Sequence, residues 1–197
     1  MIQVKDVVKS FDGNVVLNHI SANFEDGKVN MIIGQSGSGK TVLMKSMIGL
    51  HQIDEGEIIF DTRNGQENLA EMKEKEVRML HREVGMLFQG AALFDSMTVQ
   101  ENVMYPLEMF SDMTDEEKVA RARFCLERVN MPERAFGLMP SEISGGMQKR
   151  VAIARAIALN PKYLFCDEPN SGLDPRTSLV IDQLIQDITR EYNICTI

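Results

Sequence analysis

The stretch GQSGSGKT, residues 34–41, fits the pattern G-x-x-x-x-G-K-[ST] of a glycine-rich loop that holds phosphate. An apolar run at 29–33 precedes it and a helical pattern at 40–50 follows, so we expect a buried strand, the loop and a helix. Backbone N–H groups of such a loop close around phosphate oxygens at the positive end of the helix. We therefore expect Lys40 to bridge the terminal phosphates of a nucleotide and Thr41 to bind Mg²⁺. The expected nucleotide-binding residues of this segment are Gly34, Gln35, Ser36, Gly37, Ser38, Gly39, Lys40, Thr41 and Val42.

The composition indicates one globular unit in which an anionic ligand needs a local site. The 197 residues are 44% hydrophobic and 25% charged, and 29 acidic against 21 basic residues give a formal net charge of −8. This balance argues against a broad surface for DNA or RNA, so we expect no nucleic-acid partner. No apolar run approaches the roughly 18 residues of a spanning helix, so we expect a partner to supply any function that lies in a membrane. The widely spaced Cys125, Cys166 and Cys195 predict reduced, buried thiols.

Strands and helices alternate along the chain, which favours a parallel sheet covered by helices. A local antiparallel layer is expected first, from strands at 2–8 and 15–24 around the turn Asp12-Gly13-Asn14. Further strands are expected at 57–61, 84–88 and 163–166. Further helices are expected at 67–82, from Thr114 to about Asn130, from Ser144 to Asn160, and from Pro175 to about Tyr192.

An apolar strand that ends in two acids, YLFCDE at 163–168, supplies a second candidate site. Asp167 at the end of the strand would hold Mg²⁺ through its water shell, and Glu168 could polarise an attacking water. An acidic pair alone is more often a solvated turn, here before Pro169, but the preceding phosphate loop favours the catalytic interpretation. The two motifs together predict a nucleotide triphosphatase and leave open what its hydrolysis drives.

Two adjacent glycines, Gly145 and Gly146, stand at the expected start of a helix in ISGGMQKR, residues 143–150. An interior glycine costs a helix roughly 1 kcal/mol relative to alanine. The presence of two glycines without side chains at this position therefore has to be explained. One reason is a second anion-binding helix end, with Ser144 in front of it. The other is close packing of two helices.

The order and spacing of these motifs resemble the ATP-binding-cassette family over essentially the whole chain. The resemblance implies an α/β fold: a RecA-like P-loop NTPase core with an N-terminal antiparallel β subdomain and an inserted α-helical subdomain. It also implies one domain over 1–197, with the helical subdomain at about 90–158. Three further roles follow from it: Phe11 stacks on adenine, Gln89 senses Mg²⁺ and the attacking water, and Asp174 belongs to a loop that crosses a dimer interface.

Partners and localisation are also implied by the resemblance. In a head-to-tail homodimer, Ser144, Gly145 and Gly146 of one chain reach the γ-phosphate of ATP held by the other. The ATPase would dock from the cytoplasmic face of the inner membrane on separate transmembrane permease subunits and power transport. The segments at 87–95, 98–107 and 143–150 are similar to ATPases of Mla-type phospholipid transporters, which work with Mce-type lipid-binding proteins. A different transported substrate, or a soluble ATPase without a transport role, remains the alternative.

Methionines gather in the expected helical subdomain, where flexible thioethers suit either a docking groove or ordinary core packing. These are Met97, Met104, Met109, Met113, Met131, Met139 and Met147.

The match departs from the family at two places. The family has a switch histidine about one strand after the loop of Asp174, whereas His19, His51 and His81 all lie far upstream of it. We therefore expect the chain to be a fragment, truncated before that residue, which binds Mg-ATP and hydrolyses it poorly. Asn170 also stands where the family commonly has Thr or Ser.

Overall fold

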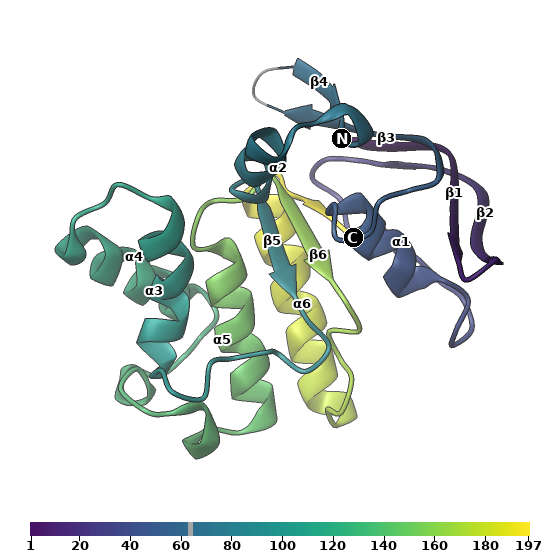
Figure 1. Cartoon of the computed structure of the whole chain (residues 1–197). Helices are drawn as coiled ribbons and strands as arrows, with labels where there is room; N and C mark the ends of the chain where they lie inside the picture. The colour runs from purple at the N-terminus through teal and green to yellow at the C-terminus, as the bar shows by residue number, and fades with distance from the viewer. Residues whose placement is uncertain (63–64) are drawn as a thin grey trace.

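Two β-sheets, with helices packed between and against them, form the molecule (Figure 1). The computed structural model describes residues 1–62 and 65–197. The first sheet is antiparallel, in the order β2-β1-β3-β4. Its strands are β1 (Ile2–Phe11), β2 (Asn14–Phe24), β3 (Glu55–Thr62) and β4 (Gly65–Asn68). Asp12 and Gly13 have φ of 48° and 80° and make the tight turn between β1 and β2, as predicted.

The second sheet is parallel and lies at the centre of the molecule, in the order β5-β6-β7. Its strands are β5 (Val84–Leu87), β6 (Tyr163–Cys166) and β7 (Cys195–Thr196). The two faces of β6 point into different cores: Leu164 into one, Tyr163 and Phe165 into the other. Each of these side chains is fully buried, which contributes about 1.5–3 kcal/mol apiece. Because β5 and β6 are parallel, the residues that follow them emerge at the same edge of the sheet.

Helices cover both sides of this central sheet. Figure 1 shows α1 (Lys40–Met47) between the two sheets, and α5 (Gly145–Ile157) and α6 (Pro175–Glu191) on the other side of β5 and β6. α3 (Val99–Phe110) and α4 (Asp115–Arg128) pack against α5 from outside. The starts predicted at Thr114, Ser144 and Pro175 are confirmed, because each of α4, α5 and α6 begins within one residue of the predicted position.

Three expectations from the sequence are corrected by the structure. Residues 29–33 do not form a buried strand: Val29 makes a single parallel bridge to Thr196, and Met31 and Ile33 are 76% and 85% exposed. The expected helix at 67–82 is replaced by β4, a 3₁₀ turn at Leu69–Glu71 and α2 (Glu74–His81), because pairing of β4 with β3 overrides local helix propensity. α1 stops at Met47, before the expected end at Leu50, where Gly49 takes a φ of 76°.

α3 was not among the predicted helices. Pro106 lies inside it, and a proline normally argues against a helix interior. The helix is held by a capping box between Thr98 and Glu101 and by the buried Asn102. The Asn102 amide donates to the carbonyls of Phe94, Met97 and Thr98 at 3.0–3.1 Å, which fixes the loop before the helix.

Candidate functional site

The glycine-rich loop is closed by the side chain of Lys40. Its Nζ donates to the carbonyl oxygens of Gly34 and Gln35, both at 2.9 Å. Gly39, with φ of 92°, sits so close to β2 that a Cβ would come within 3.1 Å of the Val16 carbonyl oxygen. Gly37, with φ of 80°, has open space around it. The close approach at 39 and the positive φ at both positions therefore favour glycine.

Thr41 and Asp167 bring two oxygen ligands together at the start of α1. The Thr41 Oγ1 lies 3.4 Å from the Asp167 Oδ1. Asp167 is placed there by β6, and its N–H donates to the Leu87 carbonyl at the end of β5 at 2.9 Å. A hydroxyl, a carboxylate and a nearby ammonium at a helix N-terminus fit a magnesium–phosphate group, because Mg²⁺ takes few protein oxygens and completes its shell with phosphate and water.

Gln89 and Glu168 form a hydrogen-bonded pair beside this oxygen pair. The Gln89 Nε2 donates to the Glu168 Oε2 at 2.7 Å and to the Ser171 Oγ at 3.3 Å. Glu168 is exposed and has a φ of 46°, which is unusual for a residue with a Cβ. The carboxylate predicted as the base and the amide predicted to sense the water are thus in direct contact.

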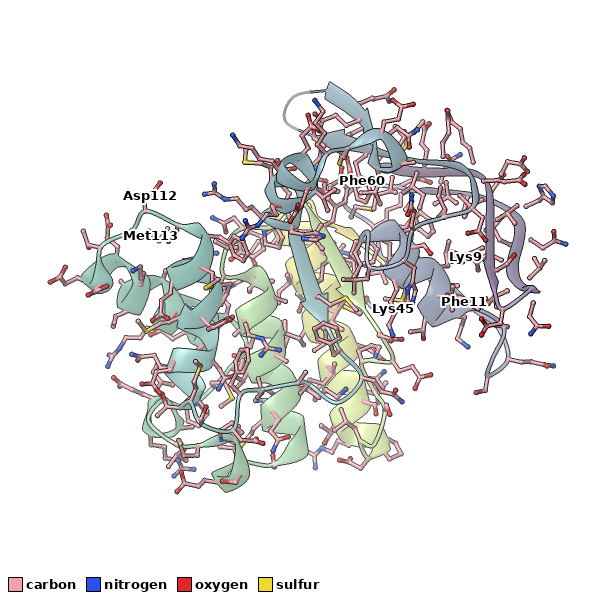
Figure 2. All side chains as sticks on the ribbon, in the orientation of Figure 1. Lys9, Phe11, Lys45, Phe60, Asp112 and Met113 are labelled. Carbon is pink, nitrogen blue, oxygen red and sulfur yellow. The ribbon has the colours of Figure 1, made fainter. Side chains whose placement is uncertain are left out.

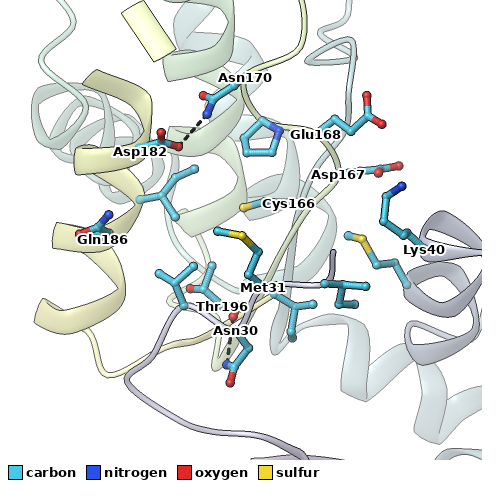
Figure 3. A pocket seen from close by; sticks show the side chains of 16 residues that line it. Asn30, Met31, Lys40, Cys166, Asp167, Glu168, Asn170, Asp182, Gln186 and Thr196 are labelled. Atoms are coloured by element: carbon cyan, nitrogen blue, oxygen red, sulfur yellow. Dashed lines mark hydrogen bonds between the residues drawn. The ribbon is translucent and has the colours of Figure 1, made fainter. Parts of the chain in front are cut away.

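A cavity of about 410 Å³ opens next to these groups (Figure 3). Lys40, Asp167 and Glu168 line its polar end, and Figure 3 shows the Lys40 ammonium pointing towards the two acids. The rest of the lining is largely apolar and includes Met31 and Ile185.

Phe11 ends β1 at the edge of the antiparallel sheet. Its ring is 38% exposed, meets the His51 ring edge-on at a centroid distance of 5.3 Å, and lies 5.3 Å from the Lys9 Nζ. Figure 2 shows Lys9 and Phe11 at one end of the molecule and Met113 at the other. β1 pairs with β2, whose residues Val16 and Leu17 contact the phosphate loop at Gly39. The exposed Phe11 ring therefore belongs to β1, and β2 lies between β1 and the phosphate loop.

Ser144, Gly145 and Gly146 lie at the N-terminus of α5, apart from the phosphate loop of the same chain, since Figure 1 places α5 and α1 on opposite sides of β5 and β6. The Ser144 Oγ accepts from the Met147 N–H at 3.3 Å. A Cβ on Gly146 would lie 2.7 Å from the Thr177 Cγ2 of α6, whereas a Cβ on Gly145 would have nothing within 4 Å.

The two explanations for the glycine pair therefore apply to different residues. Helix packing accounts for Gly146, whereas no packing contact within residues 1–62 and 65–197 accounts for Gly145. Asp174 lies close by as the N-cap of α6, where its Oδ1 accepts from the N–H groups of Arg176 and Thr177 at 3.0 and 3.1 Å.

Two cations of α5 were missed by the sequence interpretation. Lys149 is only 4% exposed and donates to the main-chain oxygen of Gln89. Arg155 donates to the carbonyl oxygens of Ala91 and Ala92, both at 2.8 Å. For Arg155 the signal was present in the run VAIARAI at 151–157, because a helix that is apolar on all sides is buried and a cation within it must find partners.

Burial shifts the titration of several groups around this site. It lowers the pKa of Lys149, and the neighbouring Cys166, Asp167 and Glu168 oppose that shift. It raises the pKa of Cys166 to about 12. The three cysteines are free thiols; Cys125 and Cys195 are buried as expected, whereas Cys166 is only partly buried.

Among the described residues, no helix is both long and apolar enough to cross a membrane.

Comparison with known proteins assigns the family. The family model described as "ABC transporter" matches residues 17–171. A methionine import ATP-binding protein, MetN, of Clostridium acetobutylicum is 38% identical over 194 residues, which are 98% of this chain and 59% of that protein. A probable ribonucleotide transport ATP-binding protein, mkl, of Mycobacterium leprae is 36% identical over 98% of this chain and 54% of its own length. The chain thus spans less than two thirds of these curated relatives.

Solved structures agree with the architecture. The dimeric post-hydrolysis state of the ATP-binding cassette MJ0796 bound to ADP and Pi superposes with a TM-score of 0.86 at 32% identity, covering 100% of this chain and 85% of that one. CbiO1 of Clostridium perfringens, part of an ABC transporter complex, gives 0.87 at 28% identity over 99% and 76%. The expected P-loop NTPase fold, with its antiparallel sheet and helical insertion, is confirmed. On the family match and these folds, the chain belongs to the ABC transporter family.

Proposed function

We propose that this chain binds Mg-ATP and hydrolyses it as the nucleotide-binding part of a membrane transporter. The observation that carries the proposal is the convergence of five side chains beyond the ends of β5 and β6. These are Lys40, Thr41, Gln89, Asp167 and Glu168. A phosphate loop, a pair of oxygen ligands and a paired carboxylate supply what hydrolysis of a terminal phosphate needs.

Each residue has a distinct task in this proposal. Lys40 exchanges its two carbonyl partners for phosphate oxygens, while Thr41 and Asp167 hold Mg²⁺. When bound, the ion neutralises charge on the terminal phosphates. Glu168 accepts a proton from the attacking water at its Oε2, and Gln89 orients that water from the neighbouring position. Phe11 stacks on the adenine ring.

The remaining contacts come from a second copy of the chain in this proposal. Ser144 and Gly145 would meet the γ-phosphate held by the partner, and Asp174 would lie in the shared interface. The open space at Gly145 supports this, since none of the described residues of its own chain lies where a Cβ would need room. The positive end of α5 would add about 0.3–1 kcal/mol of attraction for the phosphate at an exposed site.

The helical part at about 90–158 is the proposed docking region for permease subunits at the inner face of the cytoplasmic membrane. Exposed methionines support it: Met109 is 56% and Met113 39% exposed, whereas Met131 is buried and serves the core.

We propose phospholipid as the cargo, with an Mce-type partner. This proposal rests only on the similarity of the segments at 87–95, 98–107 and 143–150 to ATPases of Mla-type transporters. The names of the relatives refer to methionine import and to ribonucleotide transport, and those cargoes belong to those proteins. Neighbouring reading frames for a permease and an Mce-type protein would support the lipid; a neighbouring amino-acid receptor would contradict it.

Thermal unfolding with Mg-ATP tests the nucleotide site. At a ligand concentration of about 100 times Kd, binding stabilises by about 2.7 kcal/mol, which raises Tm by about 5–10 °C for a chain of this size. Lys40→Ala should abolish the rise. Lys45→Ala, which removes a cation from the same helix away from the loop, should keep it. If Mg-ATP does not raise the Tm of the wild-type chain, the proposal is contradicted.

A further inference from the structure

Lys149 is a buried cation with no role in the proposed ATP hydrolysis. It lies in the middle of α5 with 4% of its surface exposed, and its Nζ donates to the main-chain oxygen of Gln89. Burying an ammonium group is costly unless it is paired and hydrogen-bonded. A neutral side chain of similar size would fill the same space at lower cost, so the cation at this position calls for a reason beyond packing.

The residue that Lys149 holds is also held from its other end. The Gln89 side chain donates to Glu168 at 2.7 Å, while its main-chain oxygen accepts from Lys149. The backbone after Gln89 is unusual, because Ala91 and Ala92 have φ of 62° and 49°. Arg155, six residues after Lys149 on α5, donates to both of their carbonyls. One helix thus grips the segment 89–92 at two points.

α5 is itself fixed against the strand that leads into this segment. Gly85 of β5 lies so close to α5 that a Cβ there would overlap the main chain of Ala156. Helix, strand and the segment at 89–92 are therefore in continuous contact, from Gly145 at the N-terminus of α5 to the carboxylate of Glu168.

We propose that Lys149 is a positioning residue for ATP hydrolysis: its ammonium ties the backbone of Gln89 to α5, so that the Gln89 amide stays against Glu168. Through this tie, a γ-phosphate that engages Gly145 at the start of α5 also biases the place of Gln89. The inference rests on the proposed ATPase function, and it concerns a contact within this chain that can be measured without nucleotide.

Three variants and one matched control isolate the contact. Lys149→Met keeps the length and removes the donor, Lys149→Gln keeps a shorter neutral donor, and Lys149→Arg keeps both charge and donor. The control is Lys162→Met. Lys162 also donates to a main-chain oxygen, that of Asp61, but from the opposite end of β6.

The first measurement is amide hydrogen exchange of residues 88–93 in the nucleotide-free chain. Lys149→Met should accelerate exchange there at least several-fold, with Lys149→Arg close to wild type and Lys162→Met unchanged in this segment. Unchanged exchange in Lys149→Met would overturn the proposal. So would acceleration spread evenly over the chain, because that would mean general destabilisation. If Lys149→Met does not fold, Lys149→Gln is subjected to the same comparison.

The second measurement is steady-state hydrolysis. Lys149→Met should lower kcat about tenfold, the order seen when a supporting contact is removed. KM for Mg-ATP should stay within about twofold, since the phosphate loop is untouched, and Lys149→Arg should restore kcat. An unchanged kcat with accelerated exchange would overturn the positioning role. Failure of the wild-type chain to bind Mg-ATP would instead overturn the proposed function, while the exchange result would still decide whether Lys149 holds Gln89.

Discussion

Gly145 and Gly146 are neighbours in the sequence but have different surroundings. Gly145 has helical backbone and open space, so an alanine there reduces the entropy of the unfolded chain without a clash. We predict that Gly145→Ala raises the free energy of unfolding by about 0.4–1 kcal/mol. Gly146→Ala should lower it by about 1–3 kcal/mol, because its Cβ would press on Thr177, whose N–H is bonded to Asp174.

Urea unfolding of the two variants and the wild type measures both changes. In the same preparations, Gly145→Ala should weaken ATP-dependent dimerisation despite its greater stability. A destabilised Gly145→Ala would mean that its backbone has a packing role that the structure does not reveal.

Glu168 is the residue on which the proposed chemical step depends. Glu168→Gln keeps the size of the side chain but cannot take a proton from water, and general-base removal typically costs about 10²–10⁴ in rate. We predict a kcat lower by at least about 10² and a longer-lived ATP-bound dimer. Phosphate release and size-exclusion chromatography with Mg-ATP measure the two effects. Hydrolysis at the wild-type rate would remove Glu168 from the role of base.

At the scale of elements, capping contacts decide where the helices begin. In α3 the Thr98 N–H donates to the Glu101 carboxylate at 2.7 Å, and this bond holds the pKa of Glu101 below its usual range. A lowered pKa in the folded chain means that the contribution is complete above the unfolded value of about 4.3. It is lost as the pH falls through the lower, folded value.

Thr98→Ala keeps that N–H but removes the hydroxyl, which accepts from the Glu101 N–H at 3.3 Å and donates to the Glu101 carboxylate at 2.8 Å. The substitution should destabilise the chain by about 1 kcal/mol at neutral pH. Thr98→Ser, which keeps the hydroxyl, should cost much less. Glu101→Gln should flatten the dependence of stability on pH below about pH 5. Urea unfolding between pH 3 and 7 measures these effects, and equal stability of the alanine and serine variants would show that the hydroxyl of Thr98 contributes nothing.

The elements also show why some of the fold could be predicted and some could not. α4, α5 and α6 begin at local signals, a capping threonine, a capping serine and a proline, which act within a few residues. β4 depends on pairing with β3, and α3 continues through Pro106 although a proline cannot donate to the carbonyl four residues before it. The segment at 29–33 has the apolar pattern of a strand but forms an isolated bridge between Val29 and Thr196, in which the Asn30 N–H donates to the Thr196 carbonyl at 2.7 Å. Contacts between distant segments decide these cases, and local patterns do not contain them.

At the scale of the whole molecule, the candidate site also has one part that the sequence could predict and another part that it could not. Gln89 and Asp167 could be brought together by reasoning, because residues that follow the parallel strands β5 and β6 meet at one edge of the sheet, whereas Thr41 follows no strand of that sheet. The tie from Lys149 to Gln89 depends on which side of α5 faces that edge, which no motif reports. The separation of Gly145 from the phosphate loop, which the family resemblance implied, is seen in the three-dimensional arrangement, and the proposed site therefore needs a second chain.

Mixed dimers test that necessity. Lys40→Ala removes the proposed phosphate contact, and Gly145→Asp places a carboxylate at the proposed anion-binding end of α5, where the open space accommodates it. Each variant alone should be inactive. Mixed in equal amounts, half of the dimers combine one chain of each kind and contain one intact site, so about a quarter of the wild-type ATPase activity should return. Lys40→Ala mixed with Thr41→Ala should recover no ATPase activity. Both substitutions lie in the phosphate loop, so each site of a mixed dimer keeps one of the defects. If the first mixture also stays inactive, although size-exclusion chromatography shows that mixed dimers form, the nucleotide is not shared head to tail between two chains.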